Sequence, residues 1–249
     1  FHYVIHAGSV NDGFVDNYDS LSYRVNAFGT KNLIKALNFN VLEHFIYMST
    51  FQVYGIHGGD VTENTLVAPK NDYALSHLMG EYFVSMLMPK NSYSVIRLTN
   101  SYGCPKDFDS SKWYLILNYL SKSAFDKKEI IMTSNGKAIR DFIWMDDVVK
   151  VLLSLLDSRP DNDIYNLSSG IATSLFEVAT AVQDAYQHYC GICLPIVTSI
   201  DDTNSYEQSL HVSSEKIKQK VHFTPKDRLF EESLKIFELI ESSNSKLEK

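Results

Sequence analysis

Short apolar segments alternate along the chain with longer stretches in which apolar residues recur every three or four positions. The short segments are rich in β-branched and aromatic residues and are apolar over most of their length, which is typical of strands buried on both faces of a sheet. Strands that alternate with helices predict βαβ units and a parallel sheet. We expect strands at residues 3–6, 45–48, 94–98 and 164–167.

The longer stretches predict helices, the first over about 18–37. A second helix is expected over about 71–88 and is ended by Pro89. Its apolar side is expected to consist of Leu75, Leu78, Met79, Tyr82, Phe83 and Met86. Three further helices are expected at residues 146–156, 175–189 and 230–239, the last on the surface with a frayed tail after it.

This order of elements predicts an α/β fold, namely a Rossmann-like, doubly wound parallel sheet with a smaller lobe over the strand ends. Residues 1–102 and 140–169 are expected to form the sheet domain, to which the chain returns at residues 140–144. Residues 103–139 and 170–225 are expected to form the lobe, and residues 226–249 a C-terminal helix and tail.

Small polar residues follow each of the four predicted strands. In open α/β sheets ligands bind beyond the carboxyl ends of the strands, so these residues are expected to converge on one site. Any one pair also has a simpler interpretation as a helix cap or a turn. The segments are 6–9, 49–50, 99–100 and 168–169.

Composition excludes several classes of partner. The chain has 249 residues and a net charge of −7, which argues against a nucleic-acid or anionic-membrane partner. No apolar run approaches the length of a membrane span. Three cysteines cannot all pair, and Cys190 and Cys193 lack the further ligands of a metal site, so no metal is expected. With no secretory leader in the sequence, the predicted location is the cytoplasm.

Tyr73 and Thr50 are the candidates for chemistry. A phenol can give and take a proton, and the hydroxyl of Thr50 can hold the same substrate oxygen. His77 lies one helical turn after Tyr73, so both side chains share a helix face. A phenol has a pKa of about 10, which a neighbouring cation lowers, and His77 is a cation only when protonated. On these residues alone, an ordinary surface tyrosine remains the simpler interpretation.

Six motifs in a fixed order change that interpretation. The chain resembles the extended short-chain dehydrogenase/reductase family, in its NAD-dependent nucleotide-sugar epimerase/dehydratase branch. The motifs are the strand end at 4–8, N-x-x-G-T-x-N-L at 26–33, S-[ST]-x-x-V-Y-G at 49–55, R-x-x-N-x-Y-G at 97–103, R-D-[FY]-I at 140–143 with its following acids, and Y-N-[IL] with S-G at 165–170.

The resemblance implies a role for each matching residue. Tyr73 would be the acid and base, with Thr50 on the same sugar oxygen and His77 in the place of the family's lysine. The residues implied to line NAD or NADP are His6, Ala7, Gly8, Asn26, Ser49, Tyr73 and His77. Those implied to face a nucleotide-diphosphate sugar are Ser9, Thr50, Asn100 and Arg140. A homodimer is also implied, through helices near 22–38 and 73–88, where Leu87 and Met88 add apolar positions.

Two departures qualify the resemblance. His77 is mostly neutral at pH 7, so the phenolate of Tyr73 is expected to be less well stabilised than beside lysine. The chain also begins at the family's fourth strand, without the glycine-rich turn that cradles a pyrophosphate and without the residue that selects NAD over NADP. We therefore expect the chain to be a fragment of a longer protein, with an unprotected first strand in the fragment.

The sequence favours epimerisation by transient oxidation of a sugar hydroxyl. Related 4,6-dehydratases carry Asp-Glu directly after the catalytic threonine, whereas this chain has Phe51 and Gln52, which are neither acids nor bases. Dehydration and decarboxylation are therefore not expected. An NAD(P)H-dependent 4-ketosugar reductase needs the same residues and remains an alternative. A protein that binds a nucleotide or a partner without turnover is the alternative from another class.

Overall fold

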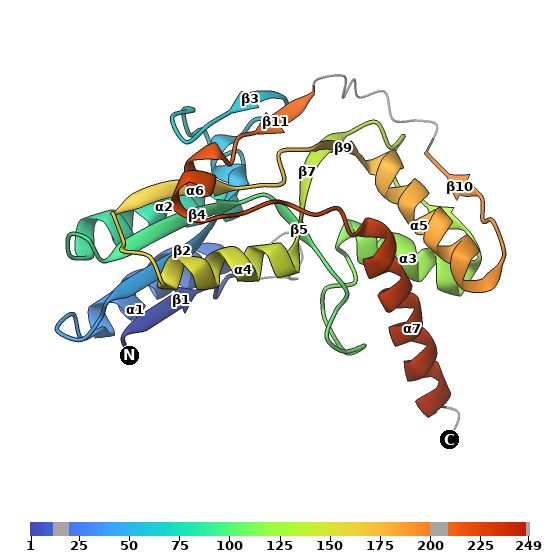
Figure 1. Ribbon diagram of the computed structural model, residues 1–249, viewed down its shortest axis with the longest axis horizontal. Helices are drawn as coiled ribbons and strands as arrows, with labels where there is room; N and C mark the ends of the chain where they lie inside the picture. The colour runs from blue at the N-terminus through green and yellow to red at the C-terminus, as the bar shows by residue number, and fades with distance from the viewer. Residues whose placement is uncertain (12–19, 200–208, 248–249) are drawn as a thin grey trace.

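The computed structural model describes residues 1–11, 20–199 and 209–247 (Figure 1). Its main sheet has four parallel strands, and each lies within one or two residues of a predicted strand. From one edge to the other, the strands are β1 (Tyr3–His6), β2 (His44–Thr50), β4 (Tyr93–Leu98) and β8 (Asp163–Leu167). The predicted α/β fold with a parallel sheet is confirmed.

Helices cover both faces of the main sheet, because successive residues of a strand point to opposite sides. Phe45 and Tyr47 of β2 pack against one set of helices, and Ile46 packs against the other. On the first side lie α1 (Thr30–Ala36), which continues a π-helical segment η2 (Tyr23–Gly29), and α2 (Asp72–Leu87). On the second side lie α4 (Met145–Leu156) and α6 (Glu215–Lys220). Residues 18 and 19 of the first predicted helix lie outside the described residues.

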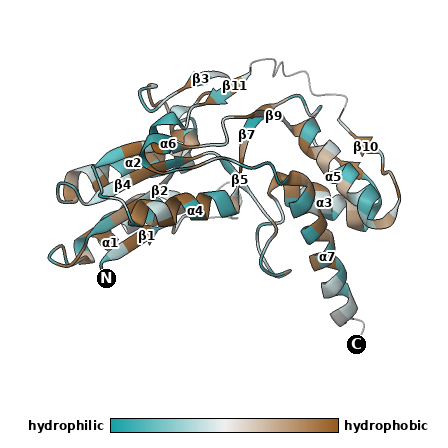
Figure 2. Cartoon of the chain, in the orientation of Figure 1, coloured by the Kyte–Doolittle hydropathy of each residue, from teal (hydrophilic) through white to brown (hydrophobic). Residues whose placement is uncertain are grey.

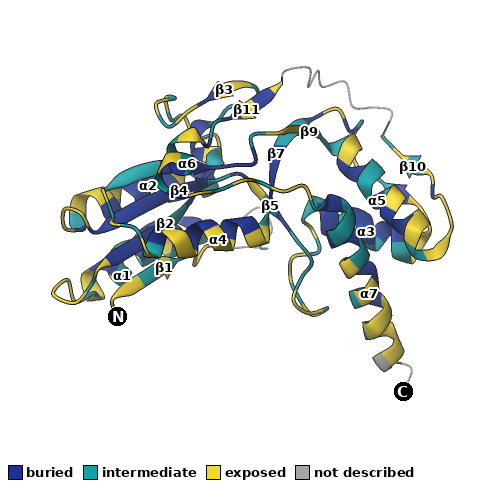
Figure 3. Ribbon diagram, in the orientation of Figure 1, coloured by how far each residue is buried: buried dark blue, intermediate teal, exposed yellow. Residues whose placement is uncertain are grey.

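Helix α4 is rich in apolar residues (Figure 2), and it has both buried and exposed positions (Figure 3). Val148 and Leu155 are buried against the sheet, whereas Val149 and Leu153 are exposed. Every helix within the described ranges is too short or too polar to span a membrane.

A second, smaller sheet lies beyond the carboxyl ends of the main strands. Its strand β7 (Ile139–Trp144) pairs in parallel with β5 (Asn100–Tyr102) and antiparallel with β9 (Ala172–Ser174). Residues 140–144, expected to return to the sheet domain, therefore form a strand of this second sheet and not of the main one. The reason is that β8 occupies the position beside β4, and β7 pairs instead with the chain that leaves β4.

Three helices pack together to form the lobe. They are α3 (Ile116–Lys127), α5 (Leu175–Cys190) and α7 (Leu229–Leu247). Leu120, Val182 and Phe237, one from each helix, are fully buried in a shared apolar cluster. Two short strands, β6 (Ile130–Ile131) and β10 (Ile196–Val197), pair beside it. The predicted surface helix is thus longer than expected and has a buried face, while residues 241–245 are mostly exposed (Figure 3).

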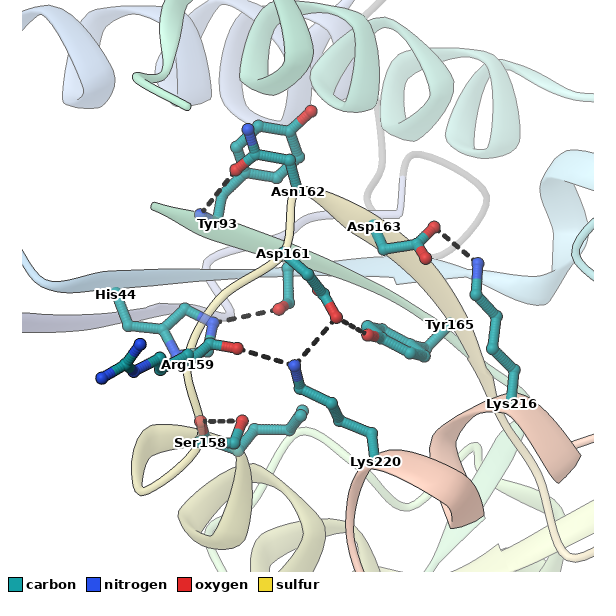
Figure 4. A network of polar contacts seen from close by, with 12 residues as sticks. His44, Tyr93, Ser158, Arg159, Asp161, Asn162, Asp163, Tyr165, Lys216 and Lys220 are labelled. Atoms are coloured by element: carbon teal, nitrogen blue, oxygen red, sulfur yellow. Dashed lines mark hydrogen bonds and ion pairs between the residues drawn. The ribbon is translucent and has the colours of Figure 1, made fainter. Parts of the chain in front are cut away.

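Residues 209–225, expected in the lobe, lie instead on the sheet domain. Strand β11 (Leu210–Val212) pairs with β3 (Gly59–Val61), and α6 packs against the main sheet. Lys216 and Lys220 of α6 form ion pairs with Asp163 and Asp161 at the start of β8, at 2.5 and 2.8 Å (Figure 4). These pairs fix α6 at the edge opposite the candidate site.

Candidate active site

Tyr73 and Thr50 are brought together from the first turn of α2 and the end of β2. Asn71 caps α2 by accepting a hydrogen bond from the backbone of Ala74 at 2.8 Å, which fixes where the helix begins. The hydroxyls of Thr50 and Ser9 lie beside the phenol of Tyr73 and favour its charged form. The two hydroxyls and the phenol of Tyr73 therefore lie close together at the carboxyl edge of the sheet.

The phenol of Tyr73 stays protonated at neutral pH. Burial raises its pKa above the ordinary value of 10.0, and the neighbouring hydroxyls of Ser9 and Thr50 partly oppose that increase because they stabilise phenolate. The hydroxyl is thus in the form that donates a proton. To act as a base, Tyr73 must first pass its own proton to another group.

His77 is buried beside Tyr73 and is only 3% exposed. Its Nε2 lies 2.9 Å from the hydroxyl of Ser9, and its Nδ1 lies 3.3 Å from the hydroxyl of Tyr47. Burial, with His6 nearby, lowers the pKa of His77 to about 4. The imidazole is therefore neutral at pH 7, so it supplies hydrogen bonds to the site and no positive charge.

The loop after β1 is held by hydrogen bonds on its inner side and is exposed on its outer side. Asn26 is buried, and its side-chain amide bonds to both the N–H and the carbonyl of Val10 at 2.8 Å. Ala7, Gly8 and Ser9 are exposed, and the nearest atom to a Cβ added at Gly8 would be 3.5 Å away. This open platform of small residues fits a flat ring such as nicotinamide. Asn26 fixes the loop from its buried side.

The side chain of Ser49 is hydrogen-bonded inside the protein. Its hydroxyl donates to Glu81 at 2.5 Å, and Glu81 also accepts two hydrogen bonds from Arg97, at 2.7 and 3.0 Å. All three residues are buried. Glu81 was not predicted as a site residue. Its spacing was a usable signal, because Glu81 follows His77 by four residues, as His77 follows Tyr73, so all three lie on one helix face.

Asn100 and Arg140 lie on adjacent strands of the small sheet. Leu98 is the register partner of Thr50, so the chain reaches Asn100 directly beyond the same edge. The side chain of Asn100 is exposed and donates to the carbonyl of Asp141 at 3.0 Å. Half-buried Arg140 donates to the carbonyl of Ile139 at 2.9 Å.

The carboxylate of Asp141 connects separate segments of this region by hydrogen bonds. Asp141 was not predicted as a site residue. It is buried and accepts four hydrogen bonds, at 2.6 to 3.0 Å, from Thr99 Oγ1, Ser169 N, Ser169 Oγ and Gly170 N. Burial raises the pKa of Asp141, and these donors oppose the increase. Two of the predicted strand-end segments, 99–100 and 168–169, are thereby joined at one acid.

The sequence of this chain matches that of a known protein family. The sequence model described as the NAD dependent epimerase/dehydratase family matches residues 1–168, which is more than half of the chain. The chain belongs to this family. The predicted resemblance is confirmed, and the match includes every strand of the main sheet.

Curated relatives differ in the reactions that their names state. The dTDP-D-glucose 4,6-dehydratase of Homo sapiens is 30% identical over 158 residues, which are 62% of this chain and 44% of that protein. The GDP-6-deoxy-D-talose 4-dehydrogenase of Aggregatibacter actinomycetemcomitans is 26% identical over 76% of this chain and 64% of that protein. The chain thus spans less than two thirds of the length of these relatives.

Solved structures share the fold. RMD from Pseudomonas aeruginosa, complexed with NADPH, superposes with a TM-score of 0.78 at 22% identity, covering 97% of this chain and 82% of that one. UDP-glucuronic acid 4-epimerase from Bacillus cereus, in complex with UDP-glucuronic acid and NAD, gives a TM-score of 0.74 at 18% identity, covering 97% and 76%. At these identities the likeness shows the fold alone.

Proposed function

We propose that this protein is a nucleotide-sugar epimerase that transiently oxidises a sugar hydroxyl. The observation that supports the proposal is the phenol of Tyr73, which lies beside the hydroxyls of Thr50 and Ser9 at the carboxyl edge of the sheet. Thr50 holds the reacting sugar oxygen from the end of a strand, and Tyr73 exchanges a proton with it. The proton taken in the oxidation is returned when the keto intermediate is reduced on its other face.

A nicotinamide cofactor is part of this proposal. NAD or NADP, when bound, accepts and returns the hydride. Ala7, Gly8 and Ser9 would hold the nicotinamide, with His6 and His77 beside them and Asn26 and Ser49 supporting from within. The choice between NAD and NADP stays open, since one solved relative holds NAD and another NADPH.

The proposed substrate is a nucleotide-diphosphate sugar. A solved relative carries UDP-glucuronic acid, and curated relatives are named for dTDP- and GDP-sugars. Asn100 would donate to the diphosphate, and Arg140 would add a charge-assisted hydrogen bond. The assignment is supported by the position of Asn100 directly beyond Leu98, the register partner of Thr50, and by that of Arg140 on the strand paired with Asn100.

The surroundings of Thr50 argue against dehydration. In the short helix η3 (Phe51–Tyr54), Phe51 packs against Tyr54, and Gln52 accepts a hydrogen bond from Asn71 at 3.1 Å. Neither side chain carries a proton to a sugar carbon. An epimerase is therefore favoured over the activity named for the human relative.

Two alternatives rest on specific observations. A 4-ketosugar reductase would use Thr50 and Tyr73 in the same way, with a single hydride transfer. A protein that binds a nucleotide without turnover gains support from His77, whose neutral ring gives Tyr73 no electrostatic help. Whether a sugar is turned over, and which product forms, distinguishes the epimerase, the reductase and the binding protein.

The test is to incubate the protein and NAD or NADP with UDP-, GDP-, CDP- and dTDP-sugars and to separate the products. An epimer supports the proposal, a reduced sugar with NADPH supports the reductase, and no turnover supports the binding protein. Tyr73→Phe is expected to lower the rate by on the order of 10² to 10⁴-fold. Tyr82→Phe, the same change at an exposed position on α2, is the matched control and should keep the parent rate.

A further inference from the structure

A layer of buried polar side chains crosses the main sheet directly beneath Thr50. Ser49 of β2 and Asn166 of β8 are both register partners of Arg97 in β4. Paired residues of parallel strands point to the same face of a sheet, so these three side chains form one row. All three residues are buried. The row lies one residue before the end of β2, because Thr50 is the next residue of that strand.

Two residues from outside the sheet cover this row and complete the layer. The carboxylate of Glu81 on α2 accepts a hydrogen bond from Ser49 Oγ at 2.5 Å and two from Arg97, at 2.7 and 3.0 Å. The guanidinium carbon of Arg97 lies 4.8 Å from the ring centroid of Tyr54, whose hydroxyl donates to Asn166 at 2.7 Å. Each of the five residues therefore has at least one partner within the layer.

Thr50 lies between two residues that the layer anchors. Ser49 precedes it in β2, and Tyr54 is the last residue of η3, which follows it. The hydroxyl of Thr50 caps η3 by accepting a backbone hydrogen bond at 3.2 Å. Arg97 stacks on Tyr54 and shares a carboxylate with Ser49. The backbone on both sides of Thr50 is therefore connected to the same guanidinium.

Glu81 connects this strand end to the helix that carries Tyr73. Tyr73, His77 and Glu81 follow one another at four-residue spacing on one face of α2. The hydrogen bond from Ser49 to Glu81 restricts how far α2 can slide or turn against β2. It therefore restricts the position of Tyr73 relative to Thr50.

We propose that this layer holds the hydroxyl of Thr50 and the phenol of Tyr73 in register for the reaction. Its positioning residues are Ser49, Tyr54, Glu81 and Arg97. The inference rests on the proposed function, because the register matters only to a reaction that uses both groups. A misplacement of about 1 Å in a reacting group can cost on the order of 10²-fold in rate.

Stability alone does not account for charges in this layer. Apolar side chains of similar volume are often as stabilising as a buried ion pair. A bidentate pair such as that of Arg97 with Glu81 adds a fixed distance and direction between the two elements that carry it. Here those elements are β4 and α2, and Ser49 extends the connection to β2.

This assignment gives Ser49 a role different from the one that the sequence resemblance implies. A residue that lines the cofactor should affect the KM for NAD or NADP, whereas a positioning residue should affect kcat. The hydroxyl of Ser49 donates to buried Glu81, which favours the second role.

The kinetic test uses the protein with NAD or NADP and the fastest substrate among the UDP-, GDP-, CDP- and dTDP-sugars. Ser49→Ala should lower kcat by on the order of 10²-fold and leave the KM for sugar and for cofactor unchanged. Ser49→Thr keeps the hydroxyl and should recover the parent kcat. A raised KM for the cofactor at parent kcat would return Ser49 to the cofactor and overturn the proposal. A kcat for Ser49→Thr as low as that of Ser49→Ala would also overturn it.

Ser94→Ala is the matched control for Ser49→Ala. Ser94 is a fully buried serine near the start of β4, where its hydroxyl lies 3.0 Å from Nε2 of buried His44. Its removal should lower stability without changing kcat, because this pair lies at the opposite end of the strands from Thr50. An equal fall of kcat in both variants would show that general loosening, and not the layer, lowers the rate.

The double variant Glu81→Leu/Arg97→Met separates positioning from stability. It should fold cooperatively in urea, because no unpaired charge remains in the protein. Its kcat should nevertheless fall by on the order of 10²-fold, since the directional contacts are lost. A folded double variant with the parent kcat overturns the proposal.

A second measurement needs neither cofactor nor turnover. In protein labelled with ¹³Cζ-tyrosine, the signal of Tyr73 is identified by its loss in Tyr73→Phe. This signal should shift in Ser49→Ala and stay unchanged in Ser94→Ala. An unchanged Tyr73 signal in Ser49→Ala overturns the positioning role.

The two proposals fail in different ways. If Tyr73→Phe abolishes turnover while Ser49→Ala keeps the parent kcat, the positioning role is wrong and the proposed function stands. If Tyr73→Phe turns over at the parent rate, the proposed function is wrong. If none of the sugars turns over, the proposed function is also wrong, and the ¹³C measurement decides the positioning role alone.

Discussion

The imidazole of His77 lies edge-on to the phenol ring of Tyr73, with ring centroids 4.6 Å apart and an interplanar angle of 65°. Such T-shaped pairs are favourable between neutral rings. One helical turn of α2 sets the spacing, and burial keeps the imidazole uncharged. The contact therefore orients Tyr73 but does not stabilise its phenolate by charge.

Introducing a cation at this position should change the pH dependence of catalysis. An ammonium beside Tyr73 favours phenolate, so the pKa of Tyr73 should fall in His77→Lys. The acid limb of the kcat profile should then move to lower pH by about one unit or more. The measurement is the rate of nicotinamide reduction across pH in parent and variant.

Ser85→Lys is the matched control for His77→Lys, since it adds the same charge on the exposed side of α2. Water screens that charge, so the profile should stay with the parent. Identical profiles for His77→Lys and the parent would show that the residue at this position does not influence the phenol.

His77 should also make the protein sensitive to mild acid. The unfolded chain takes up a proton near the ordinary pKa of 6.5, whereas folded His77 stays neutral until about pH 4. As pH falls through this window, the unfolded state binds more protons and the free energy of unfolding decreases. Integrated from pH 7 to pH 4, the loss from this group is about 3 kcal/mol.

The check is urea unfolding of the parent and His77→Gln at several pH values. The difference between their free energies of unfolding should change by about 3 kcal/mol between pH 7 and pH 4, and level off below. His6 and His44, whose pKa values are also lowered by burial, are present in both proteins and cancel in the difference. Parallel pH dependences would mean that His77 is not buried as described.

The ion pair between Glu81 and Arg97 should be important for stability, because both side chains are 5% exposed. Glu81→Gln leaves the guanidinium buried without a counter-charge and should lower the free energy of unfolding by about 3–5 kcal/mol. Asp126→Asn breaks the exposed Lys122–Asp126 pair and should cost less than about 1 kcal/mol. Urea denaturation midpoints measure both.

The double variant Glu81→Leu/Arg97→Met distinguishes an electrostatic role from a packing role. Removing both charges together should cost less than the sum of the single changes, because no unpaired charge remains. Additive losses would show that the two residues stabilise α2 and β4 independently.

The sequence predicted the main sheet because its strands are apolar on both faces and short enough to exclude buried helices. It misassigned the exposed and buried faces of α2. Tyr82 and Met86, predicted on the apolar side, are exposed, whereas His77 and Glu81 are buried. Periodicity locates a buried face only where polar residues avoid it, and here the buried face carries the polar groups of the site.

The sequence predicted only those site residues that lie in motifs or at strand ends. Thr50 and Tyr73 belong to such motifs, and the structure places their hydroxyls beside one another. Tyr47 and Asp141 were missed as site residues because an aromatic in a strand or an acid in a motif does not reveal its partner. Their contacts are long-range, as the distance in sequence from Asp141 to Thr99 illustrates.

The last prediction concerns the exposed apolar face of α2 and the homodimer that the sequence resemblance implies. Leu87 and Met88, which the sequence suggested for the interface, pack instead against the core beneath α2. Tyr82 and Met86 are 57% and 73% exposed on the same helix. If this face pairs with a second copy, Met86→Lys should convert a dimer to a monomer in sedimentation velocity, because an unpaired ammonium is then buried at the interface. Leu153→Lys, the same kind of change on exposed α4, should leave the dimer intact, and dissociation by Leu153→Lys alone would place the interface on α4 instead.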